Sequence, residues 1–385
     1  MPRKKTEEEA NTHTEHCKIE SLSKTDLLVM RYIQCHKKIV KSVMAEKLGI
    51  SLPTINTSLV KLEEERLLLD DKYTINANFA TLWGISICSD HCRIVALDFS
   101  FTVLGIDKIL PVFEGVPNVR EEKGEIIFDR PETYDSLVRK VGNIIDAILS
   151  CNVGQHLFSI GITFPTAVNN GRVLNSVHCP NYRGFSIDEY SGSAWFQKKK
   201  IDNISIVIEN DAKGAALASY QDLTTGGEES QFMANLYMDS GLGLGVIING
   251  EIFYGAENSA GEIGYIHPMP LGNEFDGDLE NKGGHLSAIM DRCFREAEAS
   301  EEVSQDMAKL VRYAISVIQN LFSFDTIVLS GRFDKHFARM KDALAPTRYA
   351  YDNMSYYALR QSNYGMNISA VGGAISAYYK WIEKI

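Results

Sequence analysis

The sequence lacks an apolar run that could cross a bilayer, and it lacks a secretion signal. No stretch approaches the ~20 apolar residues of a membrane helix. The first ten residues, MPRKKTEEEA, carry charges with no apolar segment behind them. The seven cysteines are scattered, odd in number and without a CxxC pair, which argues against a disulfide framework. These absences predict a cytoplasmic protein with reduced thiols and no membrane partner.

A zinc-binding spacing is also missing. The closest cysteines, Cys88 and Cys92, follow no common zinc spacing rule, so two ordinary half-buried thiols are favoured over the alternative of a metal site. The rest of the composition is that of a globular protein, with 45% hydrophobic and 23% charged residues. A length of 385 residues suggests two or three domains.

Charge is distributed unevenly along the chain. The net charge is −11, yet residues 21–80 carry nine Lys or Arg against seven Asp or Glu. The residues after position 80 carry 26 basic against 38 acidic side chains. An acidic body behind a mildly basic N-terminal segment is expected if that segment alone meets an anionic partner such as DNA.

A helical pattern follows a polar, charge-rich start. Residues 1–22 are predicted to be a disordered tail. Ser23 supplies a helix start signal before KTDLLVMRYIQC. A second short helix fits VKSVMAEKLG and stops at Gly49, and a third begins at Ser51. Three helices with a tight turn before the third predict a helix-turn-helix, and LLLDDKYTIN adds a possible wing, so residues 23–80 are assigned as a winged helix-turn-helix domain.

The exposed early residues of the third helix would face base edges in a DNA complex, and flanking lysines would meet phosphates. Asn56 can offer its amide to adenine, and Thr54 or Thr57 can serve bases or phosphates. The predicted DNA-binding residues are Lys38, Lys41, Ser51, Leu52, Thr54, Asn56, Thr57 and Lys61. The alternative is a three-helix bundle used for dimerisation, which the basic bias disfavours.

From residue 81 onward, strand patterns alternate with helical ones. Short apolar strands such as GISICSD and NISIVIEN are interleaved with amphipathic helices such as RPETYDSLVRKVGNIIDAILS, and the order occurs twice. The pattern predicts an α/β fold with two similar lobes and a cleft between them. The first lobe is expected over residues 81–207, with 371–385 returning to it, and the second over 208–370.

The order of several motifs resembles the ROK family of bacterial repressors and sugar kinases. The motifs are a helix-turn-helix, GITFP, ENDAKGAA, DSGLGLGVIINGEIFYGAENSAGEIGY and IVLSG. The resemblance covers nearly the whole chain after residue 22 and is most specific over 239–265. It implies a two-lobed, actin-like ATPase fold.

The resemblance also implies a set of ligand-binding positions. The family binds sugar through an Asn-Asp pair, a Glu in an Ala-Gly-Glu motif, a following His and a second downstream Glu. This sequence keeps the Asn, the Asp and the first Glu. It has Tyr in place of the His and Ser in place of the second Glu. The implied ligand-binding residues are Gly161, Asn210, Asp211, Glu262, Tyr265 and Ser287.

Two other parts of the family pattern are altered. The phosphate-binding turn of the kinases, Asp-x-Gly-Gly-Thr, aligns with Ser86, Cys88, Ser89 and Asp90, where no glycine permits close backbone approach and Asp90 would repel a triphosphate. The Gly-rich turn over 241–245 is intact and could persist for a structural reason. The family's Cys-rich zinc loop contains no cysteine here. Neither a metal nor a cofactor is therefore expected.

Asp211 occupies the position of the kinases' general base, but with an altered phosphate turn we expect it to bind an effector hydroxyl and to catalyse nothing. A plainer alternative is that Asn210 and Asp211 only cap the following helix. The leading hypothesis is a sugar-responsive transcriptional regulator, with a repressor of carbohydrate-metabolism genes favoured, that binds an operator as a homo-oligomer, dimer or tetramer. The alternatives are an ATP-dependent sugar kinase and a regulator controlled by a protein partner.

Overall fold

The computed structural model describes residues 22–36, 38–88, 90–151, 156–174, 180–190, 204–268, 285–300, 305–344 and 357–383. The predicted disordered tail falls outside these ranges except for Leu22, and so does most of the loop for which no zinc was expected. The α-helices are α1 (Lys24–Cys35), α2 (Lys41–Leu48), α3 (Leu52–Glu64), α4 (Ile106–Ile109), α5 (Tyr134–Ser150), α7 (Asp211–Thr225), α8 (Leu286–Ser300), α9 (Gln305–Phe322), α10 (Phe337–Leu344) and α11 (Ile368–Ile382).

Two larger sheets form the body of the molecule. The first has the strand order β3-β4-β2-β1-β5-β8 and the second β11-β10-β9-β12-β13. Each sheet joins an antiparallel hairpin, β1–β2 or β9–β10, to two parallel strands. The strands are β1 (Ala80–Ile87), β2 (His91–Asp98), β3 (Val119–Glu122), β4 (Glu125–Asp129), β5 (His156–Phe164), β6 (Val168–Asn169), β7 (Arg172–Val173), β8 (Ser205–Asn210), β9 (Phe232–Met238), β10 (Leu242–Ile248), β11 (Glu251–Ile252), β12 (Thr326–Gly331) and β13 (Ala358–Gln361).

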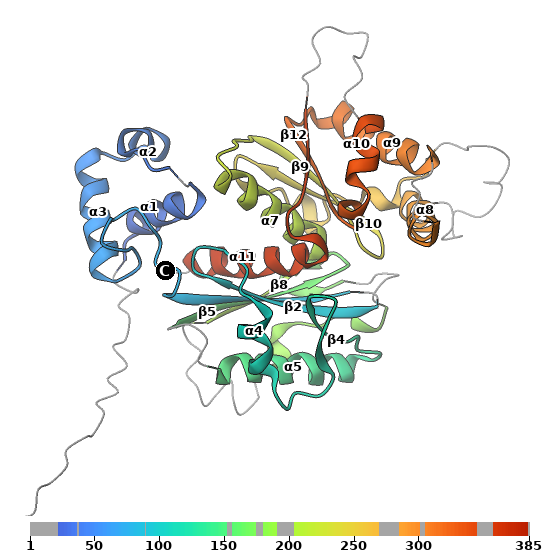
Figure 1. The fold of residues 1–385 in the computed structure, drawn as a ribbon, viewed down its shortest axis with the longest axis horizontal. Helices are drawn as coiled ribbons and strands as arrows, with labels where there is room; N and C mark the ends of the chain where they lie inside the picture. Colours follow the sequence, from blue (N-terminus) through green and yellow to red (C-terminus); the bar gives the residue numbers. More distant parts are fainter. Residues whose placement is uncertain are drawn as a thin grey trace, which may run out of the picture.

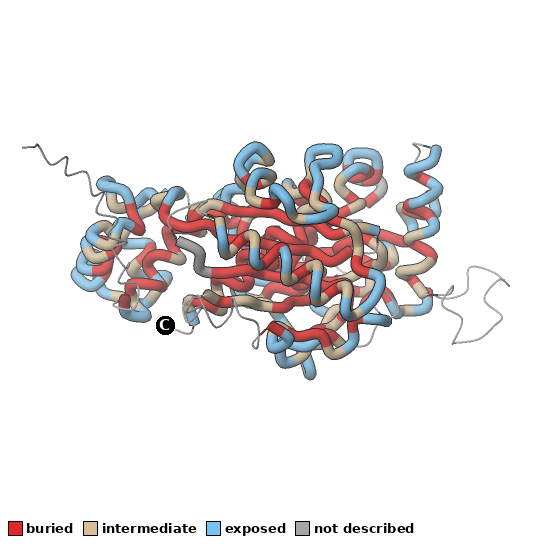
Figure 2. The backbone as a smooth tube through the Cα atoms, turned by 90° about the horizontal axis from the view of Figure 1, so that it is seen from below, coloured by how far each residue is buried: buried red, intermediate tan, exposed pale blue. Residues whose placement is uncertain are grey.

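Helices and sheets alternate in layers. Figure 1 shows α5 on the outer face of the first sheet, α11 and α7 between the two sheets, and α8, α9 and α10 beyond the second. α5 buries one side, with Leu137, Val141, Ile144 and Ile148 spaced at three or four residues, as its sequence pattern predicts. Figure 2 shows the buried residues concentrated along the strands and the helices between the sheets. The predicted α/β fold with a repeated strand–helix order is confirmed.

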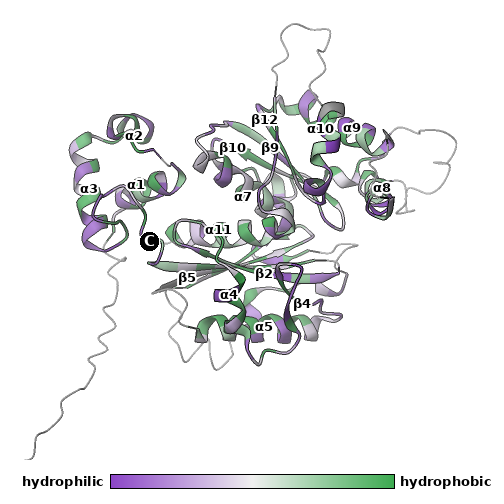
Figure 3. Cartoon of the chain, in the orientation of Figure 1, coloured by the Kyte–Doolittle hydropathy of each residue, from purple (hydrophilic) through white to green (hydrophobic). Residues whose placement is uncertain are grey.

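The central helix pair is held together by backbone contact. A Cβ added to Gly372 in α11 would lie 1.7 Å from the main-chain oxygen of Gly214 in α7, so only glycine fits there. The same helix meets the first sheet where a Cβ on Gly161 of β5 would lie 1.9 Å from the main-chain oxygen of Gly373. Most of α11 is buried, and Figure 3 shows apolar residues along it. Small residues therefore let α11 lie between β5 and α7.

The three N-terminal helices lie in the segments where the sequence predicts helices. Ser23 caps α1 in a capping box with Asp26, whose backbone N–H lies 3.2 Å from the Ser23 hydroxyl. α2 ends at Gly49, which adopts the left-handed conformation with φ of 64°. Ser51 caps α3 by accepting a hydrogen bond from the N–H of Thr54 at 3.3 Å. The wing hairpin is reduced to a single antiparallel bridge between Leu68 and Ile75.

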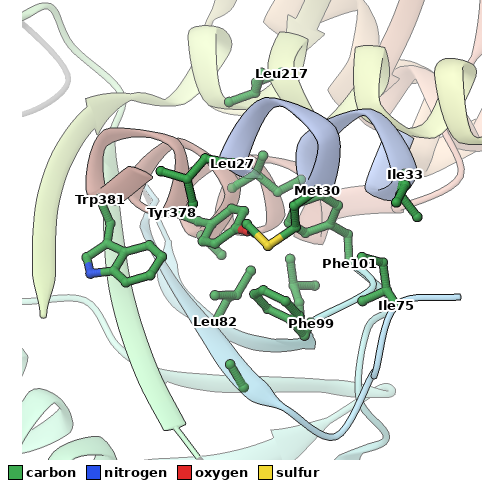
Figure 4. Packing of buried hydrophobic residues seen from close by; sticks show 14 of the residues in the cluster. Leu27, Met30, Ile33, Ile75, Leu82, Phe99, Phe101, Leu217, Tyr378 and Trp381 are labelled. Atoms are coloured by element: carbon green, nitrogen blue, oxygen red, sulfur yellow. The ribbon is translucent and has the colours of Figure 1, made fainter. Parts of the chain in front are cut away.

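α1 attaches the three-helix unit to the body. Figure 4 shows Leu27, Met30 and Ile33 of α1 beside the buried side chains of Phe101 and Tyr378. The same apolar cluster contains residues of β1, β2, α7 and α11. The helices thus share one core with the body, and no polar linker separates them.

Buried hydrogen bonds fix the orientation of α1 in that core. The amide of Gln34 donates to the main-chain oxygen of Phe99 at 3.0 Å and accepts from the Tyr378 hydroxyl at 3.1 Å. The amide of Gln221, in α7, donates to the main-chain oxygen of Gln34 at 3.3 Å and accepts from the Tyr379 hydroxyl at 2.8 Å. Buried polar groups are costly when unpaired, so these bonds specify one docking position.

Replacement of Gly372 by Ala should lower the free energy of unfolding by about 3 kcal/mol or more, because the new methyl would overlap the backbone of Gly214. Urea unfolding followed by circular dichroism measures this change. Gly142→Ala in α5 is the matched control. Its methyl would meet only a ring carbon of Tyr190 at 3.2 Å, and the change should be under about 1 kcal/mol. Equal effects of the two substitutions would contradict the close contact of α7 with α11.

Candidate functional site

A cavity of about 500 Å³ opens between the carboxyl ends of β5 and β8 and the elements of the second sheet. Its walls combine carboxylate, amide, hydroxyl, imidazole and apolar groups, with few large apolar side chains. The lining residues are Pro165, Thr166, Ala167, Leu174, Asn210, Asp211, Ala212, Ser240, Gly241, Leu242, Gly243, Ser259, Glu262, Gly264, Tyr265, His285, Ser287, Ala288 and Asp291. Five of the six ligand-binding residues implied by the sequence lie together here.

Asn210 holds the junction between β8 and α7. Its side-chain oxygen accepts from the N–H of Lys213 at 3.0 Å and caps the helix. Its amide nitrogen donates to the main-chain oxygen of Thr166 at 3.1 Å and to Oδ1 of Asp211 at 3.2 Å. Asn210 therefore caps the helix, as the plainer alternative for this residue proposes. Its side-chain polar atoms are already engaged, and one of its bonds orients Asp211.

Asp211 begins α7 at the base of the cavity. Its Oδ1 accepts from the N–H of Ala212 at 2.7 Å. Burial, together with the charges of Asp239 and Glu262, raises the pKa of Asp211 to about 8. At neutral pH the carboxyl is therefore largely protonated, and it can donate a hydrogen bond to a ligand as well as accept one.

Glu262 reaches the cavity from the loop after β11, and a buried lysine fixes that loop. The ammonium of Lys213 in α7 donates to the main-chain oxygens of Asn258 and Ala260, at 3.0 and 3.1 Å. Burial raises the pKa of Glu262, and the nearby charge of Lys213 opposes the increase. Lys213 is only 1% exposed, so it acts on the cavity through the backbone of this loop.

Tyr265 and Ser287 occupy the places of the two altered family positions. The Tyr265 side chain is 47% exposed, and its ring meets that of His285 edge to face at a centroid distance of 5.6 Å. The Ser287 hydroxyl accepts from the N–H of Leu242 at 2.9 Å and so connects α8 to β10. Tyr265 thus offers an aromatic surface to the cavity, while Ser287 is engaged within the protein.

Gly161 does not line the cavity, and its assignment as a ligand-binding residue was wrong. It lies inside β5, paired with Gly84 of β1 and Val207 of β8. Its missing side chain makes room for the backbone of Gly373 in α11. The glycine of GITFP is therefore explained by packing between the sheet and the central helix.

Strand β2 carries, close to the β1–β2 turn, an arginine that sequence reasoning missed. Arg93 is 3% exposed, and its guanidinium lies 2.9 Å from the sulfur of Cys88 and 3.0 Å from Oε2 of Glu125. The charge of Arg93 also acts on Asp239, which follows β9 in the second sheet. The guanidinium of Arg93 thus lies beside the altered phosphate turn. Ser89, a residue of that turn, lies outside the described residues.

The glycines of the second turn have a packing function. A Cβ on Gly243 would lie 2.6 Å from that of Ala212, and a Cβ on Gly245 would lie 2.4 Å from that of Ala216. Both alanines belong to α7. Gly243 and Gly245 are therefore needed to pack β10 on α7.

Most of the predicted DNA-binding residues lie on an exposed surface of the three-helix unit. Figure 1 shows α3 on the side of that unit away from the body. The ammonium of Lys41 lies 2.7 Å from Oδ1 of Asn56 and 5.7 Å from the ring centroid of Tyr73, so α2, α3 and the wing meet at this point. The exposed members are Lys38, Ser51, Leu52, Thr54, Asn56 and Thr57, and Lys41 is half-buried.

Lys61 faces inward instead. Its ammonium pairs with Oδ2 of Asp26 in α1 at 3.2 Å, and Asp26 also accepts from the Ser58 hydroxyl at 2.6 Å. Asp26 is 5% exposed, and hydrogen bonds, led by that from Ser58, hold its pKa below the ordinary value against the opposing effect of burial. The lysine therefore stabilises the α1–α3 packing, and its assignment as a phosphate contact is not supported.

Comparison with known proteins agrees with the motifs. The ROK family profile matches residues 119–283. The chain contains a ROK family domain. A solved ROK family transcriptional regulator, a homologue of the E. coli MLC protein, has a TM-score of 0.61 at 15% identity, with coverage of 93% of this chain and 97% of that one. The mixed α/β fold of this chain is thus that of ROK proteins.

Both regulators and kinases occur among the relatives of the ROK domain. The xylose repressor of Bacillus spizizenii is 24% identical over 251 residues, 62% of this chain and 59% of the repressor. The ROK family glucokinase of Streptomyces griseus, solved with glucose and AMPPNP, has a TM-score of 0.53 at 18% identity and covers 78% of this chain and 99% of its own. The chain spans between 41% and 68% of the lengths of the curated relatives it matches.

Several groups of the ROK domain's cavity carried no sequence signal. Thr166, Ser240 and Ser259 are ordinary loop residues, and Asp291 lies one helical turn beyond Ser287 on α8. The signal for Lys213 was its position as a lone charge in the small-residue helix AKGAALAS. Such a residue is rarely buried without a specific partner, so it could have been identified as structural.

Two predicted absences concern features outside the cavity. Cys88 and Cys92 are buried free thiols, and the described part of the ROK domain contains no group of three side chains placed to hold a metal ion. No helix in the described ranges is long and apolar enough to cross a membrane.

Asp211 should make the stability of the protein depend on pH. Its pKa is about 8 in the folded chain and about 3.9 in an unfolded one. Between these values the folded chain keeps a proton that the unfolded chain has released, so the free energy of unfolding falls as pH rises from about 4 to about 8. Asp211→Asn should flatten this dependence and gain stability relative to the wild type as pH rises.

Urea unfolding of both proteins between pH 5 and pH 9 measures the difference. The exposed Asp146→Asn on α5 serves as the control and should follow the wild type. Parallel pH profiles of the wild type and Asp211→Asn would contradict the raised pKa.

Proposed function

We propose that the protein is a saccharide-responsive transcriptional regulator whose DNA-binding helices are controlled through α7. One observation carries this proposal. The first turn of α7 supplies Asp211 to the cavity. Further along, Leu217 and Ala218 belong to the same apolar cluster as α1, and Gln221 donates to the main chain of Gln34 in α1. A single rigid helix therefore connects the ligand cavity to the three-helix unit.

The chemistry of the cavity supports a saccharide ligand. Sugar hydroxyls both donate and accept, and the Asp211 carboxyl, the Glu262 carboxylate and nearby hydroxyls offer the matching atoms. The exposed ring of Tyr265 offers a flat apolar surface for a sugar ring. The relatives include xylose repressors and a glucokinase, which favours this class of ligand for the present chain.

The exposed surface of the three-helix unit supports the proposal that the partner is DNA. The early residues of α3 are exposed and include the hydrogen-bonding side chains of Thr54, Asn56 and Thr57, and α3 itself lies on the side of the three-helix unit away from the body (Figure 1). A homo-oligomer would place two such units on a near-palindromic operator. Ligand binding would then change the operator affinity by favouring one position of α7 over another.

A sugar kinase is the second candidate, and Asp211 is the observation that favours it. A carboxyl with a pKa near 8 can act as a general base for a sugar hydroxyl. The buried guanidinium of Arg93, which is engaged with Cys88 and Glu125, weighs against a nucleotide site, and the packing function of the β10 glycines means that they are no evidence for one. ATP turnover above that of Asp211→Asn would establish the kinase, whereas operator release by a protein and by no saccharide would establish a regulator controlled by a protein partner.

Asn56→Ala should weaken binding to a DNA sequence selected from a random pool by the full chain. The expected loss is about 1–3 kcal/mol, because the amide side chain would no longer contact a base edge. Binding to random DNA should be unchanged. Glu64→Ala, an exposed change at the other end of α3, is the control and should preserve both affinities. Equal losses on selected and random DNA would assign Asn56 to the DNA backbone.

Gln221→Met should weaken the coupling between the cavity and the DNA-binding helices. The change removes the bonds to the Gln34 main chain and the Tyr379 hydroxyl while keeping a similar side-chain volume. The variant should still be stabilised by the saccharide that raises the melting midpoint of the wild type, but that saccharide should change operator affinity less.

The exposed Gln231→Met is the matched control and should respond to the saccharide as the wild type does. A full saccharide response in Gln221→Met would show that α7 does not transmit the signal through this contact. Titrations of labelled operator with and without the saccharide measure the response.

A further inference from the structure

Three backbone donors at the base of the cavity are already used. Helix N-termini bind anions through free N–H groups. At the start of α7, however, the N–H of Ala212 is bound by Asp211 at 2.7 Å and that of Lys213 by Asn210 at 3.0 Å. In the glycine-rich turn, the N–H of Leu242 is bound by Ser287 at 2.9 Å. These three groups therefore offer nothing to a phosphate.

The described side chains that line the cavity offer no Lys or Arg in their place. Lys213, the nearby ammonium, donates to two main-chain oxygens beneath the Glu262 loop. Among the described lining residues only His285 could gain a positive charge, and its Nδ1 lies 3.2 Å from the main-chain oxygen of Tyr265.

The carboxylates of the cavity differ in what they can accept. Asp291 is neutralised by Arg332 at 2.6 Å and by Arg295 at 3.1 Å. In the described part of the chain, no hydrogen bond engages the carboxylate of Glu262. Its oxygens are available to accept from hydroxyl or ammonium groups, and they would repel a phosphate.

We propose that this cavity selects an unphosphorylated saccharide, neutral or carrying an amino group, and excludes the phosphate esters of the same sugars. This selectivity rests on the proposed function. It follows because the described lining residues present carboxylates and uncharged hydroxyl groups but no Lys or Arg, and three N–H groups at the base are already bound, so a buried phosphate dianion would meet like charges without a compensating cation.

Matched pairs of ligands test the selectivity. Glucose, mannose, glucosamine and N-acetylglucosamine are each compared with their 6-phosphates in thermal melts of the full chain, and binding is then titrated by calorimetry. At least one free sugar should raise the melting midpoint. Its phosphate should bind at least ~100-fold more weakly, since the phosphate meets no compensating charge.

Two variants test whether charge or shape causes the discrimination against phosphate esters. Ser259→Arg places a cation at the exposed edge of the cavity. It should reduce the ratio of the affinities for the free sugar and for its phosphate by at least ~10-fold. Glu262→Gln keeps an acceptor oxygen but removes the negative charge. It should reduce the same affinity ratio, but by less than Ser259→Arg does. Glu296→Gln, an exposed change on α8, is the control and should leave the discrimination unchanged.

The outcomes distinguish this inference from the proposed function. A phosphate ester that binds as tightly as its parent sugar, or more tightly, overturns the selectivity and leaves the regulator proposal standing. A discrimination that Ser259→Arg does not alter attributes the exclusion to shape and overturns the electrostatic argument. If no saccharide binds while the chain still binds its selected DNA, the saccharide proposal fails and this inference fails with it.

Discussion

The backbone contact between α7 and α11 is the constraint on which the rest of the structure depends. Gly372 brings the two helices together at a distance that no other residue would allow, and a Cβ on Gly214 would already be tight, at 3.1 Å from the main-chain oxygen of Ser369. α11 packs on β1 and β5 of the first sheet, and α7 packs on β9 and β10 of the second. Because this helix pair joins the two sheets, it fixes the cavity that lies between them at the start of α7.

The same helix pair forms the surface to which α1 is attached. Tyr378 and Tyr379 of α11 and Gln221 of α7 bind the last turns of α1, and the guanidinium of Arg31 stacks over the Tyr379 ring at 4.0 Å. An ion pair between Lys47 of α2 and Glu229 adds a second contact. A close-packed interface of this kind moves between discrete arrangements and does not deform continuously, which is what transmission from a distant ligand requires.

The sequence predicted local features, such as the starts of helices, better than it predicted which distant residues a side chain contacts. Helix starts at Ser23 and Ser51 and the carboxylate at Asp211 follow from neighbours a few residues away, and the structure contains all three. Lys61 and Gly161 were assigned to ligands because their partners, Asp26 and Gly373, are far away in the sequence. A motif shows that a glycine or lysine is required, but only the fold shows whether a ligand or another segment of the chain requires it.

That distinction bears on the nucleotide site of the kinases that share this fold. Glycines in β10 would suggest phosphate binding, yet Gly243 and Gly245 are required by Ala212 and Ala216 of α7 in any protein that packs these elements so closely. Their presence therefore says little about ATP. The β1–β2 turn is more informative, because Cys88 and the buried guanidinium of Arg93 occupy the surroundings in which a phosphate would need free backbone donors. A positive charge already committed to Cys88 and Glu125 must be released before it can bind a nucleotide. The α7–α11 packing that these glycines serve is thus independent of any nucleotide, and the same α7 reaches from the cavity to the three N-terminal helices.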